Sequence, residues 1–335
     1  MNYQNFGTTG VQVSPLCLGT MLFGSTCSEK DAINITHRAI NDGINIFDTA
    51  NGYNKGLSEE ILGKAIIEKR NDIFLVTKVN ASMGSGPNDK GLTRYHIINE
   101  VENSLKRLGT DHIDLYFLHR RDPNTPLEES ISAMDYLVNQ GKIRYIGISN
   151  HKAWEICSAT MFSQLNNMAS ISAVQDLYNI VDRDVEVELL PFCDEFGMAV
   201  MAYSPLARGM LTGKYGIDKP IPIDSRAGRG DQRMLESGMR EHSMKVASSL
   251  RNIANKYNKT ISQLAVNWVI DNPIVSTSII GPRTMQQYDD NLGALDWRLE
   301  LDDLKEIDRL VPLGEHTGFG FNDPMNPVVG RPILQ

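Results

Sequence analysis

The stretch "IDLYFLHRRDPNTPLEESISAMDYLVNQGKIRYIGISN" (residues 113–150) decides the fold. It begins and ends with short apolar runs of strand type, 113–119 and 143–150. The segment between them has helical periodicity: Thr125 is placed to cap it, Pro126 suits its first position and Gly141 ends it. A strand, a helix and a second strand in succession form the repeating unit of a parallel β/α fold.

The same alternation runs along the whole chain. Strand-like runs occur at 16–20, 44–50, 73–79, 113–119, 143–150, 172–179, 198–205 and 276–282. Eight units favour a closed (β/α)₈ TIM barrel over an open doubly wound sheet, and no GxGxxG follows the first run. The segment "YQNFGTTGVQVSP" (3–15) predicts an N-terminal β-hairpin that plugs the opposite end. We expect one barrel domain over residues 1–335, with a tail of about 314–335 that is extended or mobile.

Composition narrows the class of protein. A net charge of −8 and a pI near 5.4 argue against a nucleic-acid or acidic-membrane partner, because such partners need a basic face. No signal-peptide pattern or bilayer-spanning run is present, and the four cysteines lack metal-site spacing. We therefore expect a cytoplasmic protein with reduced thiols and no metal.

Polar residues gather where the predicted strands end. They are Asp48, Lys78, His119, Ser149, Asn150, Gln175, Tyr203 and Ser204. Singly, each has an ordinary structural explanation, but the carboxyl ends of barrel strands meet at one mouth, where such folds build active sites. Long loops also follow strand ends there, at 80–92 and 206–240.

One combination at this mouth suggests acid–base chemistry. Tyr53 follows Asp48 in "NIFDTANGY" (45–53). An unperturbed tyrosine is a poor acid, but a nearby ammonium favours the phenolate and lowers its pKa. Tyr53 thus becomes a candidate general acid, with Lys78 tuning it and Asp48 holding Lys78. His119 could donate a hydrogen bond to the same substrate oxygen.

These residues, set in "DTANGY", "TKV" and "LHRRDP", resemble the aldo-keto reductase superfamily. The likeness covers nearly the whole chain and includes "GLSEEILGKAI", "SLKRLGTDHIDLYFLH" and "YSPLARGMLTGKY". It implies an NADP-dependent oxidoreductase on a (β/α)₈ barrel, which reversibly reduces an aldehyde or ketone to an alcohol. The catalytic set would be Asp48, Tyr53, Lys78 and His119.

The resemblance also implies an NADP(H) site. Its candidate residues are Gly19, Thr20, Met21, Asp48, Ser149, Asn150, Gln175, Tyr203, Ser204, Pro205, Leu206, Gly209, Lys214, Ile280, Gly281, Arg283, Gln287 and Asn291. Arg283 at a helix start suits a 2′-phosphate and favours NADP over NAD. Two departures from the family pattern stand out, Arg120-Arg121 beside His119 and Gly281-Pro282-Arg283 in the phosphate segment.

Three alternatives stay open at this point. Lys78 could form a Schiff base, as in barrel aldolases. Asp48, His119 and His151 could serve a metal-dependent hydrolase. The sequence is also similar to the branch that includes potassium-channel β subunits, which implies an NADP-binding redox-sensing or regulatory partner with slow turnover. The loops suggest a polar or anionic carbonyl substrate, and the oligomeric state is open.

Overall fold

Eight parallel strands form a closed barrel in the computed structural model, which describes residues 1–217 and 219–318. The strands are β3 (Leu16–Gly19), β4 (Ile46–Asp48), β5 (Phe74–Val79), β6 (Ile113–Leu118), β7 (Ile143–Ser149), β8 (Ile171–Leu177), β9 (Ala199–Tyr203) and β10 (Val275–Ile280). They follow one another in chain order, and β10 pairs with β3 to close the ring. This confirms the predicted (β/α)₈ barrel.

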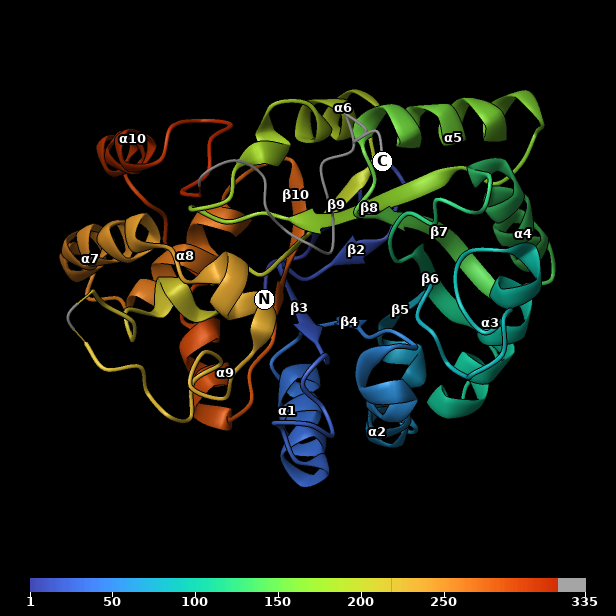
Figure 1. Cartoon of the computed structure of the whole chain (residues 1–335), viewed down its shortest axis with the longest axis horizontal. Helices are drawn as coiled ribbons and strands as arrows, with labels where there is room; N and C mark the ends of the chain where they lie inside the picture. Colours follow the sequence, from blue (N-terminus) through green and yellow to red (C-terminus); the bar gives the residue numbers. More distant parts are fainter. Residues whose placement is uncertain (218, 319–335) are drawn as a thin grey trace, which may run out of the picture. The chain divides into compact units, whose positions relative to one another are not determined.

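Helices connect successive strands and stand outside them (Figure 1). They are α1 (Glu29–Asn41), α2 (Leu57–Ile66), α3 (Arg94–Leu108), α4 (Leu127–Asn139), α5 (Ala153–Leu165) and α6 (Leu189–Glu195), with 3₁₀ turns at Tyr53–Gly56 and Arg70–Asp72, and α9 (Met285–Leu292) follows the last strand. Ser28 caps α1 and Thr93 caps α3 through their side chains. The predicted cap of α4 is wrong: Pro126 is the N-cap residue, while Thr125 donates its hydroxyl hydrogen to Asp122 (2.8 Å).

The predicted N-terminal hairpin is confirmed. Strands β1 (Gln4–Asn5) and β2 (Gln12–Val13) pair antiparallel. The buried ring of Phe6 packs against Phe74 at the start of β5, with 5.3 Å between ring centroids. The amide of Gln4 donates to the carbonyl of Val275 (3.2 Å), at the start of β10. These contacts place the hairpin at the amino ends of the strands, opposite the end where the polar residues gather.

Alternate strand positions fill the barrel with apolar side chains, as period-two geometry requires. The interior cluster includes Cys17, Ile46, Phe74, Val76, Leu115, Phe117, Ala173, Ala199, Met201 and Ile279. The Phe117 ring occupies the space that a Cβ on Gly147 would need. The barrel interior is therefore a packed core, and reactive groups have room only at its mouth.

The chain divides into two compact units, and the barrel belongs to the first: Met1–Asp176, Glu188–Tyr203 and Pro273–Asp289. The second comprises Leu177–Val187, Ser204–Asn272 and the chain from Asp290. The expectation of a single domain stays a prediction. Helices of the second unit are α7 (Glu241–Lys256), α8 (Ile261–Ile270) and α10 (Leu301–Leu310), with 3₁₀ turns at Asp184–Glu186 and Ala207–Thr212 and a π-helix at Met234–Gly238.

The buried side chain of Arg183 contacts several segments of the second unit. Its guanidinium contacts Glu186 (3.0 Å) and Asp308 (2.8 Å) and lies over the Trp268 ring. The start of the predicted tail is held here too, since the backbone N–H of Thr317 donates to the carbonyl of Val181 (3.0 Å). The rest of that tail, 319–335, lies outside the described residues.

No helix in the described part of the chain combines the length and apolar character that crossing a bilayer demands. All four cysteines fall within this part and are free thiols, and Cys17, Cys27 and Cys193 are buried.

Candidate active site

Several barrel strands change from apolar to polar at their last inward position, at the mouth of the barrel. Val76 is followed two residues later by Lys78, Ala173 by Gln175, and Met201 by Tyr203. Side chains two residues apart lie on the same face of a strand, so these polar side chains lie on the inner face of the barrel, directly above the apolar core. Asp48 and Ser149 end β4 and β7 in the same way, and His119 follows β6.

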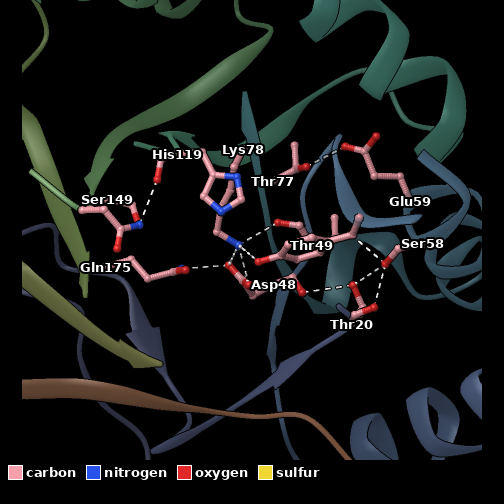
Figure 2. Close-up of polar contacts among 12 residues, drawn as sticks. Thr20, Asp48, Thr49, Ser58, Glu59, Thr77, Lys78, His119, Ser149 and Gln175 are labelled. Atoms are coloured by element: carbon pink, nitrogen blue, oxygen red, sulfur yellow. Dashed lines mark hydrogen bonds and ion pairs between the residues drawn. The ribbon is translucent and has the colours of Figure 1, made fainter. Parts of the chain in front are cut away.

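A buried ion pair lies at the centre of the site (Figure 2). The ammonium of Lys78 is 2.7 Å and 2.6 Å from the two carboxylate oxygens of Asp48, and both side chains are almost wholly buried. The Lys78 Nζ also donates to the carbonyl of Thr49 (2.8 Å). Gln175 donates its side-chain amide to Asp48 (2.8 Å). These contacts satisfy both charges and fix the position of the ammonium.

Tyr53 reaches the ion pair from a turn after β4. Asn54 and Lys55 adopt positive φ angles of 51° and 55° there, which turns the chain sharply before α2. The phenol oxygen of Tyr53 lies 3.2 Å from Lys78 Nζ. The ring of His119 meets the Tyr53 ring edge to face, with 5.8 Å between centroids. The structure thus brings all four predicted catalytic residues together.

The environment sets the charge states of this group. Burial raises the pKa of the Tyr53 phenol above its ordinary value near 10, and the Lys78 ammonium opposes this without reversing it. The expected lowering by Lys78 is therefore present but smaller than the effect of burial. Burial alone would lower the pKa of Lys78, but Asp48 and Tyr53 together raise it. In the absence of substrate, the pair is a neutral phenol beside a firmly charged ammonium.

A cluster of three hydroxyl groups supports the backbone of Asp48 (Figure 2). Thr20 donates from its hydroxyl to the carbonyl of Asp48 (3.1 Å), and Ser58 donates to the carbonyl of Thr20 (2.8 Å). The Ser58 oxygen also lies 2.8 Å from the Thr20 hydroxyl and 3.1 Å from that of Thr49. Ser58 is the second residue of α2, which begins at Leu57, and it is buried beneath the site.

The neighbouring Glu59 is also buried, although its place in the first turn of α2 suggests an exposed acid. Its carboxylate accepts from the Thr77 hydroxyl (2.6 Å) and pairs with Arg107 on α3 (2.6 Å). Thr77 directly precedes Lys78 on β5, with its side chain on the outer face of the strand. Glu59 thus anchors the outer side of the strand whose inner side carries the lysine.

The turn between Asp48 and Tyr53 is more constrained than its Asn-Gly sequence suggests. A Cβ added to Gly52 would lie 2.5 Å from the Cβ of Ala81 in the loop after β5. Only glycine allows this close approach, so loop 80–92 packs directly on the turn that carries Tyr53.

Four candidate cofactor residues form a hydrogen-bonded set on β7, β8 and β9. The amide of Asn150 donates to the Ser149 hydroxyl (2.8 Å) and to the carbonyl of His119 (3.0 Å). The Tyr203 hydroxyl donates to the side-chain carbonyl of Asn150 (2.8 Å). Together with Gln175, these groups offer the donors and acceptors that a carboxamide needs, and Tyr203 adds an aromatic face. This donor set fits a nicotinamide.

The other candidates in the first unit lie on two segments. Gly19 ends β3 and is buried together with Thr20, whereas Met21 is exposed. At the end of β10, Ile280 and Gly281 lead into α9, where the Gln287 side chain accepts from the backbone N–H of Arg283 (2.9 Å). The backbone N–H of Gln287 donates in turn to the hydroxyl of Thr284 (3.3 Å), so Gln287 helps to fix the start of α9.

The remaining candidates belong to the second unit. They are Ser204, Pro205, Leu206, Gly209, Lys214 and Asn291. Ser204 and Gly209 adopt positive φ angles of 57° and 101°, and the Lys214 side chain packs over Gly209. A cofactor role for these residues stays a prediction.

The two arginines after His119 have different surroundings. Arg121 forms an ion pair with Glu155 (2.6 Å), which neutralises its charge. Arg120 lies close enough to Tyr53 to favour its phenolate.

Comparisons with known proteins agree with this geometry. Residues 15–312 match the family model described as "Aldo/keto reductase family". The chain is 36% identical to "Uncharacterized oxidoreductase YrpG" of Bacillus subtilis (strain 168), over 93% of this chain and 96% of that protein. It is 37% identical to "Probable voltage-gated potassium channel subunit beta" of Arabidopsis thaliana, over 88% and 92%. It is 33% identical to "Aldo-keto reductase YhdN" of Bacillus subtilis (strain 168), over 98% and 97%.

The family match spans the barrel from β3 to α10 and includes every strand that contributes a polar group at the mouth. The chain that carries the buried Asp48, Lys78 and Tyr53 is thus similar over nearly its full length to proteins named as an oxidoreductase and an aldo-keto reductase. On this evidence, the chain belongs to the aldo/keto reductase family.

Proposed function

We propose that this protein reversibly reduces an aldehyde or ketone to an alcohol with NADPH. The observation that carries the proposal is the Lys78 ammonium, held by both oxygens of Asp48 and placed 3.2 Å from the Tyr53 hydroxyl. A bound nicotinamide would supply the hydride to the carbonyl carbon. The residues of the chain would then have to polarise the carbonyl oxygen and protonate it.

Tyr53 is the proposed proton donor. Its raised pKa keeps the phenol protonated through neutral pH, so the proton is present when a carbonyl binds. As the proton leaves, negative charge develops on the phenol oxygen beside the Lys78 ammonium, which stabilises it. Asp48 keeps Lys78 charged and oriented, and the His119 ring beside Tyr53 would help to bind the carbonyl oxygen.

Two finer features are part of the proposal. Ser149, Asn150 and Gln175 would hold the carboxamide, with the Tyr203 ring against the nicotinamide. Arg283 would bind the 2′-phosphate, which favours NADP. Arg120 beside Tyr53 supports a polar or anionic carbonyl compound as substrate.

Replacement of the phenol tests the proposal. Tyr53→Phe should lower the rate of aldehyde reduction by about 10²-fold or more, the effect of losing a general acid, and leave NADPH quenching of tryptophan fluorescence nearly unchanged. Tyr3→Phe is the matched control, because the Tyr3 side chain is exposed and its hydroxyl donates to the carbonyl of Gly43 (3.1 Å). Near-normal reduction by Tyr53→Phe would require another proton donor.

The potassium-channel β-subunit relative supports a second candidate, an NADP-binding regulatory partner with slow turnover. Steady-state NADPH oxidation with a panel of aldehydes and ketones separates the two candidates. A metabolic enzyme turns over its preferred carbonyl faster than the cofactor exchanges in the absence of substrate. Turnover no faster than that exchange for every carbonyl would favour the regulatory candidate.

A further inference from the structure

The side chain of Arg107 on α3 supports two catalytic segments from outside the barrel. Its guanidinium pairs with Glu59 (2.6 Å), whose carboxylate accepts from the Thr77 hydroxyl on β5 (2.6 Å). Its aliphatic stem packs on Gly56, the last residue of the 3₁₀ turn. One side chain thus contacts the turn that begins with Tyr53 and, through a single carboxylate, the strand that carries the catalytic lysine.

The Arg107 stem lies against the backbone of Gly56. A Cβ added to this glycine would lie 2.7 Å from Cδ of Arg107 and 3.0 Å from its Nε. Gly56 also has a φ of 91°, a conformation that favours glycine. The middle of the turn, Asn54 and Lys55, is exposed, whereas Gly56 is buried. The contact with Arg107 therefore supports the turn at its buried end.

Arg107 is also the counter-ion of two buried carboxylates. Besides Glu59, its guanidinium contacts Glu100 on its own helix (2.5 Å), and both acids are almost wholly buried. Burial raises the pKa of Glu59, and Arg107 opposes this effect. Because a buried charge without a partner is costly, the guanidinium is held between its two acids. The same two contacts fix the stem that lies on Gly56.

We propose that Arg107 is a positioning residue for carbonyl reduction, which sets the 3.2 Å distance between the Tyr53 hydroxyl and Lys78 Nζ. This distance decides how strongly the ammonium stabilises the negative charge that develops on the phenol oxygen. Burial and the charges of Lys78, Asp48 and Arg120 shift the pKa of Tyr53, and Arg107 is not among these charges. Arg107 therefore acts through position. The inference rests on the proposed function, because it needs Tyr53 as the proton donor.

Steady-state kinetics test the proposal, with each rate expressed per site that binds NADPH, so that unfolded protein does not count. Arg107→Met keeps an unbranched stem and removes the guanidinium. Its kcat should fall about 10-fold to 100-fold, because small misplacements of reacting groups are costly, while KM and the Kd of NADPH stay within about twofold. Arg107→Lys keeps a cation for Glu59 and should restore kcat to within about threefold of the unmodified protein. Arg70→Met is the matched control, because Arg70 pairs with Asp114 (2.8 Å) at the amino ends of the strands and is similarly buried.

Thr77→Val tests the strand contact and leaves Arg107 in place. It removes the hydrogen bond to Glu59, and kcat should fall about threefold to tenfold. Thr277→Val on β10 is its control and should change nothing, because the buried Thr277 hydroxyl has no partner within residues 1–217 and 219–318. An unchanged kcat in Arg107→Met, an equal fall in Arg70→Met, or no recovery in Arg107→Lys would overturn the proposal. If Arg107→Met does not fold, the two threonine variants decide the question, and equal rates in both would refute it.

The Tyr53→Phe variant separates this inference from the proposed function. Near-normal reduction by Tyr53→Phe would refute both. A large loss in Tyr53→Phe together with an unaffected Arg107→Met would refute this inference alone. Adding Arg107→Met to Tyr53→Phe should lower the residual rate less than about twofold, because losses at residues that act as one unit do not add. A further loss as large as that of Arg107→Met alone would show that Arg107 does not act through Tyr53.

Discussion

Asp48→Asn should expose the cost of leaving the Lys78 ammonium buried without its counter-ion. Removing one member of a buried ion pair typically costs about 3–5 kcal/mol of unfolding free energy. Lys78 keeps its contacts with the Thr49 carbonyl and the Tyr53 hydroxyl, so we expect a loss near the lower end, about 3 kcal/mol at pH 7. Urea unfolding followed by circular dichroism measures this loss.

The stability of the unmodified protein and that of the variant should change in opposite directions at high pH. In the unmodified protein the pKa of Lys78 is raised, so its stabilising contribution is complete below the unfolded value near 10.4 and is lost at higher pH. Without Asp48, burial dominates and the pKa should fall below that of the unfolded chain. The unfolded variant then binds more protons, so its stability should rise as the pH approaches about 10.

A double variant completes the test. Asp48→Asn/Lys78→Met removes both charges, and we expect it to be about 2 kcal/mol more stable than Asp48→Asn, because an apolar replacement of a buried pair is often neutral. A loss below about 1 kcal/mol for the single variant, a deficit that grows with pH, or a double variant no more stable than the single would refute the reasoning.

Three further predictions concern the supports of the site. Ser58→Ala should lower the free energy of unfolding in urea by about 1–3 kcal/mol, because Thr49 loses its hydroxyl partner. Ser163→Ala is the control and should be nearly neutral, because the buried Ser163 hydroxyl has no partner among the described residues. Gly52→Ala should cost about 1–3 kcal/mol by overpacking, and a second change, Ala81→Gly, should restore stability; no rescue would show that the contact is not limiting. Burial lowers the pKa of His151, so unfolding free energy should fall as the pH drops below about 6.5, by up to ~1.4 kcal/mol per pH unit. His151→Gln should flatten that slope, and an unchanged slope would assign it elsewhere.

Strand periodicity was sufficient to predict the barrel and the gathering of its polar residues. Both follow from local rules, because parallel strands joined by helices must bring their carboxyl ends to one mouth. The union of Asp48, Lys78 and His119 is therefore a consequence of topology, and Tyr53 joins them through the turn that follows Asp48.

The supports beneath these residues could not be predicted in the same way. Ser58 and Glu59 look like a cap and a first-turn acid, and a helix pattern does not reveal that the start of α2 is pressed against β4 and β5. Glu59 is paired there with Arg107 of α3, 48 residues away in sequence, and Ser58 contacts Thr20, 38 residues away. The sequence did not predict that burial outweighs Lys78 and raises the pKa of Tyr53. Desolvation depends on packing from several segments at once, which a local pattern does not show.

The strand register also makes the site sensitive to insertions and deletions. Asp48 pairs with Val76, so Lys78 stands one inward position further along β5 and reaches back to the carboxylate. One residue added to or removed from β5 before Lys78 would turn the lysine to the outer face of the barrel, where Thr77 now meets Glu59. Loop 80–92 carries no such parity constraint. The length of this loop can therefore change without turning Lys78 away from Asp48, whereas the strand lengths that align the two charges must stay fixed.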